Sequence, residues 1–201
     1  NGRMIDKKDK EEYIKGVRKS LETAKYLGTK HLFIMTDILK EDRTVLEPPY
    51  EISEEEKLQS VKDILNELRA DAEAAGVTLV IEPLNIVVDH KGYYLDHSKP
   101  AFDIVREINS PNIKVLYDVY HMQIMEGNII ETLKNNMDAI GYVHIADVPG
   151  RNQPGTGELN FSNIFKALRE VDYRGYVGFE FEPKGKATED VIKEVFEMIN
   201  K

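Results

Sequence analysis

The sequence predicts an α/β fold with a parallel sheet, and three observations support this. Five short apolar runs alternate with amphipathic helical segments along the 201 residues. The runs lack the alternation of polar and apolar residues that is typical of a sheet with one solvated face. Four of the five runs end in a side chain that can bind a metal: Glu82, Asp118, His144 and Glu180. In parallel α/β proteins, ligands bind at the carboxyl ends of the strands.

Spacing and terminal residues indicate the first elements. Apolar residues recur at helical spacing from about residue 8 to residue 27, and Gly28 is placed to end this helix. The apolar run 30–35 then predicts a buried strand. Ser53 and Glu56 form a capping box at the start of a long amphipathic helix, which continues to the next glycine.

The later elements repeat this alternation. The strand over 77–82 ends before Pro83, which cannot donate a backbone hydrogen bond. After a loop, Ser98 and Pro100 start a helix that leads to the strand over 113–118. The remaining predicted elements are a helix over 128–137, a strand over 140–144, a Gly- and Pro-rich loop over 146–158, a helix over 164–175, a strand over 176–180 and a helix over 191–199. The order is one helix followed by five strand–helix pairs.

Composition limits the classes of function. A net charge of −9 argues against nucleic acid or an anionic membrane as the partner, because both favour clustered basic residues. No apolar run approaches a membrane span and no signal peptide is visible. The absence of cysteine excludes disulfides and thiolate metal sites, and we expect a cytoplasmic protein. With 41% hydrophobic residues, the chain can bury the core of one domain.

The four side chains at strand ends are predicted to form a single metal site. They are separated by about one strand–helix unit each, so adjacent parallel strands would bring them together. Three carboxylates and an imidazole favour Mn²⁺ or Mg²⁺, with Co²⁺ and Zn²⁺ as alternatives. Each side chain alone would equally fit a polar residue at a solvated strand end. Spacing does not decide between Glu180 and Glu182, which lie on the same face of the strand.

Two further residues are candidates for contact with a substrate. His121 follows Asp118 by three residues, and we expect it in a loop just past the strand end. Arg151 lies in the long loop after His144, where it could receive an anionic or polyol substrate. Each also fits an ordinary surface position. The other histidines have no comparable context and are expected to be structural: His31, His90 and His97.

Several motifs together resemble the hydroxypyruvate isomerase family, within the xylose-isomerase-like (β/α)₈ sugar isomerases and epimerases. The similarity runs from about Ala24 to the carboxyl terminus. The motifs are Tyr117-Asp-Val-Tyr-His-Met-Gln123, Val143-His-Ile-Ala146, Val148-Pro-Gly-Arg151, Gly157-Glu-Leu-Asn-Phe161 and Gly178-Phe-Glu-Phe-Glu-Pro183. The resemblance implies a divalent-metal site at Glu82, Asp118, His144 and Glu180, with His121 and Arg151 touching substrate. It favours Glu180 over Glu182, because the family pattern is Gly-x-Glu-aromatic-x-Pro.

The resemblance also implies that the barrel is incomplete at its amino-terminal side. The first three strands of the family have no counterpart here, so residues 1–201 are expected to form a single partial TIM-barrel domain with five strand–helix units. The strands beginning near Lys30 and Tyr176 would be open edges that invite a partner, such as another copy of the chain. We expect the missing part to be cleaved off, disordered or replaced by contacts from another chain.

The predicted function is a metal-dependent aldose–ketose type isomerase of a small hydroxycarbonyl or sugar substrate. The cation would stabilise an enediolate, while Glu82 and Glu180 act as the general acid–base pair. One alternative is a ketose 3-epimerase with the same metal site, which is favoured by His144 because hydroxypyruvate isomerases generally show glutamine there. The other is a non-catalytic metal-binding partial barrel. A related endonuclease is disfavoured by the net charge and by the absence of additional His and Asp ligands.

Overall fold

A single parallel sheet organises the chain in the computed structural model, which describes residues 2–199. Its strands lie side by side in the order of the sequence, β1-β2-β3-β4-β5, and every neighbouring pair is parallel. The strands are β1 (His31–Ile34), β2 (Thr78–Ile81), β3 (Ile113–Asp118), β4 (Ile140–Ile145) and β5 (Tyr176–Phe179). The predicted parallel α/β class is therefore confirmed.

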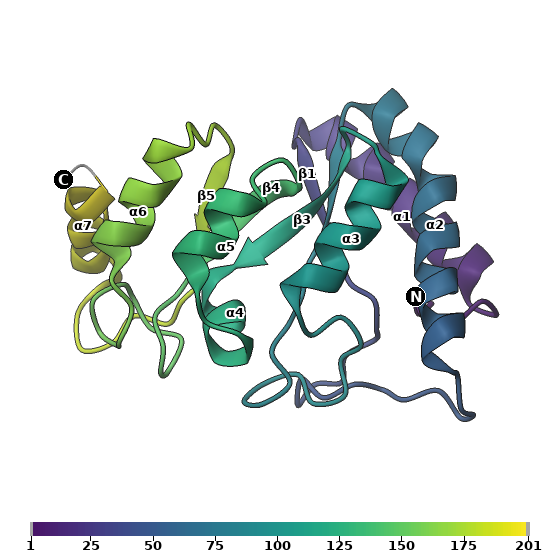
Figure 1. Cartoon of the computed structure of the whole chain (residues 1–201), viewed down its shortest axis with the longest axis horizontal. Helices are drawn as coiled ribbons and strands as arrows, with labels where there is room; N and C mark the ends of the chain where they lie inside the picture. Colours follow the sequence, from purple (N-terminus) through teal and green to yellow (C-terminus); the bar gives the residue numbers. More distant parts are fainter. Residues whose placement is uncertain (1, 200–201) are drawn as a thin grey trace.

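Helices cover the outer side of this sheet. Figure 1 shows α2, α3, α5 and α6 in succession along one side of the strands, with α1 packed beside α2. The helices are α1 (Lys10–Leu27), α2 (Glu54–Ala75), α3 (Ser98–Ile108), α4 (Val119–Met125), α5 (Ile129–Asn135), α6 (Phe161–Glu170) and α7 (Thr188–Ile199). None of the helices between residues 2 and 199 combines the length and apolar character that crossing a membrane requires.

The predicted helix ends follow local chemistry. Ser53 and Glu56 form the expected capping box at the start of α2. Gly28 and Gly76 end α1 and α2 in the left-handed conformation, with φ of 73° and 61°, which glycine adopts without steric cost. These caps fix where the chain leaves each helix to enter β1 and β2.

The sheet curls strongly about its inner face. Five strands spaced about 4.8 Å apart would separate the edge strands of a flat sheet by about 19 Å. The rings of His31 in β1 and Tyr176 in β5 nevertheless lie 5.3 Å apart, and both pack edge-on or stacked with Tyr142 of β4. The five strands therefore form a trough, the curvature of a partial barrel, with an aromatic floor.

Two expectations from the sequence are wrong. His121 lies in a helix, α4, and not in a loop; the Asp118 side chain accepts hydrogen bonds from the Tyr120 and His121 amides, so the helix starts directly after β3. The strand over 30–35 is only partly buried, because β1 is a sheet edge and Phe33 is 46% exposed. The same holds for the other edge, where Tyr176 is 59% exposed.

The predicted domain range 1–201 includes residues 1, 200 and 201, which lie outside the described residues. Within the described part, β1 and β5 are the two edges of the sheet. Pairing of these edges with another copy of the chain stays a prediction.

Candidate active site

Four side chains from four consecutive strands meet at the carboxyl end of the sheet. Each offers one ligand atom, and these atoms all lie within 4.8 Å of one another. We call this set the carboxylate–histidine cluster: Glu82, Asp118, His144 and Glu180. Glu82 and Glu180 directly follow β2 and β5, while Asp118 and His144 stand opposite each other on β3 and β4.

Strand register and a glycine make room for this convergence. His144 is paired with Gly178 on β5, and a Cβ atom there would lie 2.9 Å from both His144 Cδ2 and Tyr142 Cε1. A larger residue at position 178 would therefore push His144 out of the cluster. Asp118 uses its two oxygens differently: Oδ1 caps α4, and Oδ2 lies 3.8 Å from His144 Nδ1.

Three members of the cluster are mostly buried, and burying their charges costs free energy. We call Glu82, Asp118 and His144 the inner members. Burial raises the pKa of Glu82 and of Asp118, because the protein interior disfavours the charged carboxylate. Burial alone would lower the pKa of His144, but the neighbouring carboxylates of Glu180 and Glu82 outweigh it and raise this pKa to about 9. His144 therefore carries a proton at neutral pH in the metal-free chain and partly compensates the carboxylates.

The cluster has the donor set and the unsatisfied atoms that a divalent cation requires. Among residues 2–199, Glu82 Oε1 and His144 Nδ1 are buried and have no hydrogen-bond partner, although His144 Nδ1 lies 3.2 Å from Glu180 Oε2. Buried polar atoms in proteins nearly always have a partner, so such atoms point to a missing ligand. Three carboxylates and one imidazole suit a hard or borderline divalent ion. The residues fit the predicted cation.

Glu180 differs from the inner members because it lies beyond an edge strand. Its side chain is 55% exposed, and Arg151 Nη2 lies 3.0 Å from its Oε2 atom. Contact with His144, together with the charge of Arg151, lowers the pKa of Glu180 to about 2. Glu182, the alternative that spacing left open, is not part of the cluster.

His121 is fully buried and neutral. Burial lowers its pKa to about 3, and the Asn85 backbone N–H donates to its Nδ1 atom at 3.1 Å. Since Nδ1 accepts, the proton of the neutral ring belongs on Nε2. That atom has no hydrogen-bond partner in the part of the chain described here, so it is available to donate to a ligand.

Arg151 is presented by a tightly organised loop. Asp147 is buried, and its carboxylate accepts four backbone N–H groups of the same loop, those of Val148, Gly155, Gly157 and Leu159. Arg151 itself adopts φ of 54°, and its guanidinium lies 5.1 Å from the centre of the Tyr120 ring. The Arg151 side chain is thus fixed by its contacts with Tyr120 and Glu180.

A cavity of about 540 Å³ adjoins the cluster. Glu82 and Glu180 line it together with His121 and Arg151, so both pairs of predicted site residues face one space. His90, expected to be structural, also lines this cavity and packs its ring 5.3 Å from that of His121.

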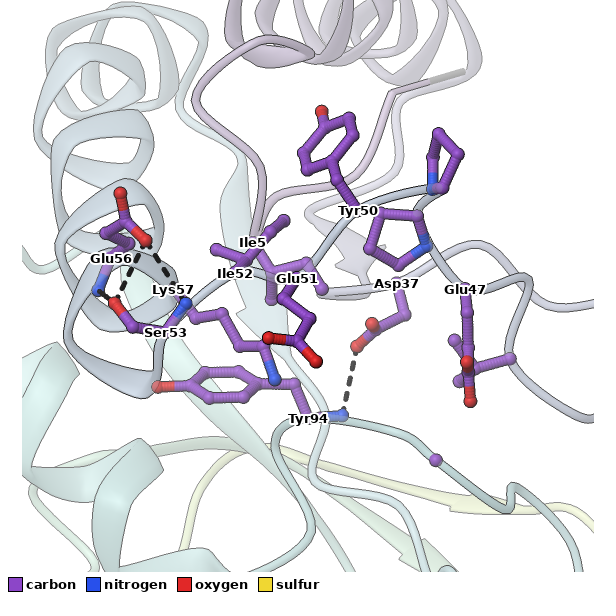
Figure 2. Close-up of a pocket in the computed structure, with 14 residues that line it drawn as sticks. Ile5, Asp37, Glu47, Tyr50, Glu51, Ile52, Ser53, Glu56, Lys57 and Tyr94 are labelled. Atoms are coloured by element: carbon purple, nitrogen blue, oxygen red, sulfur yellow. Dashed lines mark hydrogen bonds between the residues drawn. The ribbon is translucent and has the colours of Figure 1, made fainter.

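A larger cavity, of about 780 Å³, lies outside the cluster between the loop over 45–52 and the start of α2. Figure 2 shows its wall, where Asp37 accepts a hydrogen bond from the Tyr94 amide and Lys57 lies against the Tyr94 ring. None of the four cluster residues lines it. We therefore place the candidate active site in the smaller cavity.

The sequence did not reveal the residues that support the site. Asn85 follows Glu82 by three residues, and that proximity to a strand end was a signal that could have been used. Asp89 and Tyr120 act through a contact between a loop and α4 that are distant in sequence, and no spacing rule identifies such a contact. Asp147 accepts backbone N–H groups of its own loop, which the residue types do not reveal.

Comparisons with known proteins identify the family of the fold. Residues 3–201 match the family described as Xylose isomerase-like TIM barrel. The chain is 35% identical over 178 residues to a putative hydroxypyruvate isomerase of Xenopus laevis, covering 87% of this chain and 62% of that protein. It is 33% identical over 174 residues to the hydroxypyruvate isomerase of Escherichia coli K12, covering 87% and 64%. The chain thus spans less than two thirds of the length of these relatives.

Solved structures share the fold. The AP endonuclease, family 2, of Brucella melitensis superposes with a TM-score of 0.86 at 29% identity, covering 98% of this chain and 72% of that one. The apo form of 3-keto-D-glucoside 4-epimerase from E. coli gives a TM-score of 0.82 at 26% identity, covering 100% and 75%. The match across residues 3–201 and the curled parallel sheet agree, and the chain belongs to the xylose isomerase-like TIM barrel family.

Proposed function

We propose that this chain carries the active site of a divalent-metal-dependent isomerase of a small hydroxycarbonyl compound such as hydroxypyruvate. The observation that carries the proposal is the carboxylate–histidine cluster at the edge of a cavity that also receives a neutral histidine and an arginine. The names of the two isomerase relatives supply the substrate class.

The four cluster residues would hold the cation. Mn²⁺ or Mg²⁺ is proposed because three of the four donors are carboxylate oxygens; Co²⁺ and Zn²⁺ are alternatives that accept the same set. A bound cation would polarise the substrate carbonyl and the adjacent hydroxyl, which acidifies the C–H bond between them.

Glu82 and Glu180 are proposed as the acid–base pair. They face the cavity from different strands, so they can reach the two carbons of a small substrate from different directions. Glu180 is ionised because its pKa is lowered, as a general base must be. One carboxylate removes the proton from carbon to give an enediolate, and the other assists its return to the neighbouring carbon.

His121 and Arg151 are proposed to orient the substrate. His121 donates from Nε2, whose proton follows from the hydrogen bond at Nδ1. Arg151 offers guanidinium N–H groups beside Glu180, where they can bind an oxygen or carboxylate of the substrate.

The test is an assay of the metal-loaded protein with hydroxypyruvate, with product analysis by NMR. Migration of the carbonyl, dependence on added Mn²⁺ and loss of both after chelation are expected. Tight Mn²⁺ binding without any turnover of hydroxypyruvate or of small ketoses would overturn the isomerase proposal. That result would favour a non-catalytic metal-binding partial barrel, a reading supported by the two open sheet edges.

A ketose 3-epimerase is the second candidate, supported by a specific residue. His144 occupies the position where the resemblance to ketose 3-epimerases expects histidine, and one structural relative is named a sugar 4-epimerase. Product analysis separates the two enzymes, since isomerisation moves the carbonyl and epimerisation only inverts a carbon centre. The endonuclease name of the Brucella relative calls for one further control, incubation with DNA that carries an abasic site, from which we expect no cleavage.

A further inference from the structure

Asp89 occupies a central place in the site cavity without belonging to the carboxylate–histidine cluster. It lies in the loop between β2 and α3 and lines the 540 Å³ cavity. Its side chain is 13% exposed, so it is a mostly buried charge that needs partners. Its hydrogen-bond partners are Tyr120 and Asn85. Tyr120 contacts Arg151 and Asn85 contacts His121, the two residues proposed to touch the substrate.

The first chain of contacts runs from Asp89 to Arg151. The Tyr120 hydroxyl donates a hydrogen bond to Asp89 Oδ2 at 2.8 Å, which fixes the tilt of the Tyr120 ring. The Arg151 guanidinium lies over that ring, 5.1 Å from its centre, and pairs with Glu180 on its other side. Asp89 therefore acts on Arg151 through the orientation of an aromatic ring.

The second chain of contacts runs from Asp89 to His121. Asn85 Nδ2 donates to Asp89 Oδ2 at 2.9 Å, while Asn85 Oδ1 accepts the backbone N–H groups of Val88 and Asp89. These bonds lock the Asn85 side chain and the turn that carries it. The backbone N–H of the same residue donates to His121 Nδ1, so the turn also fixes the histidine tautomer.

Other charged and titratable groups around Asp89 favour its ionised form. Burial alone would raise the pKa of Asp89, but the hydrogen bonds from Asn85 and Tyr120 and the charge of Arg151 together lower it. Arg43 Nη1 lies 3.6 Å from its other oxygen. A carboxylate at this position accepts from several donors at once, which a neutral amide cannot do equally well.

We infer that Asp89 is a positioning residue, which holds Arg151 through Tyr120 and His121 through Asn85 so that both face the substrate together. The inference rests on the proposed function for its catalytic consequence. The contacts themselves do not depend on which hydroxycarbonyl compound is bound.

The test compares Asp89→Asn, Tyr120→Phe and the double variant, with Asp103→Asn as a matched control on the exposed side of α3. Circular dichroism and Mn²⁺ titration first establish that each variant is folded and keeps its metal affinity within about twofold. We expect kcat/KM for hydroxypyruvate to fall about tenfold in Asp89→Asn, somewhat less in Tyr120→Phe, and no further in the double variant. Control activity should match the wild type. Multiplicative effects of the two substitutions would overturn the inference, because residues that act through one another are not additive.

A second readout does not depend on turnover. The ¹⁵N chemical shifts of the His121 ring should report the Nε2–H tautomer in the wild type. In Asp89→Asn the Nδ1 shift should change, because the Asn85 side-chain amide, which lies 2.7 Å from Nδ1, loses its carboxylate partner. Unchanged shifts in the variant would overturn the inference whatever the activity. If the wild type turns over no hydroxycarbonyl compound but the shifts change as expected, the proposed function fails and the positioning role stands.

Discussion

Glu82 and Glu180 have the same side chain at the same end of the same sheet, yet their pKa values shift in opposite directions. Burial raises the pKa of Glu82, which follows the second strand of five. Contact with His144 and Arg151 lowers that of Glu180, which follows an edge strand and is 55% exposed. The comparison teaches that the place of a strand in the sheet, rather than the residue type, decides what a cluster carboxylate can do.

Glu82 and Asp118, the buried carboxylates of the cluster, are therefore a cost to the metal-free fold, whereas Glu180 is accessible to solvent. Glu82 and Asp118 add negative charge where water cannot screen it. Glu180 forms an ion pair with Arg151, so its charge contributes favourably to the stability of the fold. The predictions below test this division.

The largest expected effect is on turnover. Glu180→Gln should lower kcat by about a thousandfold, because an amide cannot act as the general base. Melting should change little, since the side chain is largely exposed. The matched control is Glu182→Gln, which removes a carboxylate that lines the same cavity but lies outside the cluster. Equal loss in both variants would show that Glu180 has no special role.

The next effect is on metal affinity. Asp118→Ala should weaken Mn²⁺ binding at least about a hundredfold in a calorimetric titration, because Asp118 is a buried member of the cluster. Asp118→Asn is the companion variant, because an asparagine retains the cap of α4 while losing the charge. Tight binding in both variants would mean that the ion binds elsewhere.

A smaller effect concerns the stability of the metal-free chain at pH 7. Glu82→Gln should raise the free energy of unfolding modestly, since it removes a charge that burial disfavours. Glu180→Gln should lower the stability slightly, because it removes a charge that the fold favours. Denaturant melts measure both, and a shift of the same sign in the two variants would contradict the opposite pKa shifts of Glu82 and Glu180.

The smallest effect is a pH dependence. The pKa of His144 is raised from 6.5 to about 9, so its contribution to stability is fully present below pH 6.5 and is lost as the pH rises through 9. The ionisation of Glu82 and Asp118, whose pKa values are raised, also costs stability as the pH rises. The melting temperature of the metal-free chain should fall between pH 6.5 and 9. In His144→Gln this fall should be shallower, and an unchanged slope would refute the assignment.

The convergence of the four ligands could be predicted from the sequence because parallel strands place their carboxyl ends at one edge of the sheet. The helix that contains His121 was missed, because Asp118 serves both as a cluster member and as the cap of α4. The exposure of Phe33 does not follow from the apolar run itself, which predicts a buried strand; it follows only from the edge position that the family resemblance implies for the strand beginning near Lys30. Asp89 was missed because its hydrogen bond to Tyr120 joins a loop to α4, which is distant in sequence.

The Asp147 carboxylate, which gathers four backbone amides, has a consequence for how this protein can diverge. The contacts involve the main chain, so they fix the length of the loop over 146–158 more strictly than its composition. Three glycines are exceptions: Gly150 and Gly155 have φ of 100° and 91°, and a Cβ atom at Gly157 would collide with the Val148 carbonyl oxygen. An insertion between Asp147 and Gly157 would break these hydrogen bonds. Replacing the Arg151 side chain would keep them, because it takes no part in them. Side chains that line the cavity can therefore change here by substitution at a constant loop length.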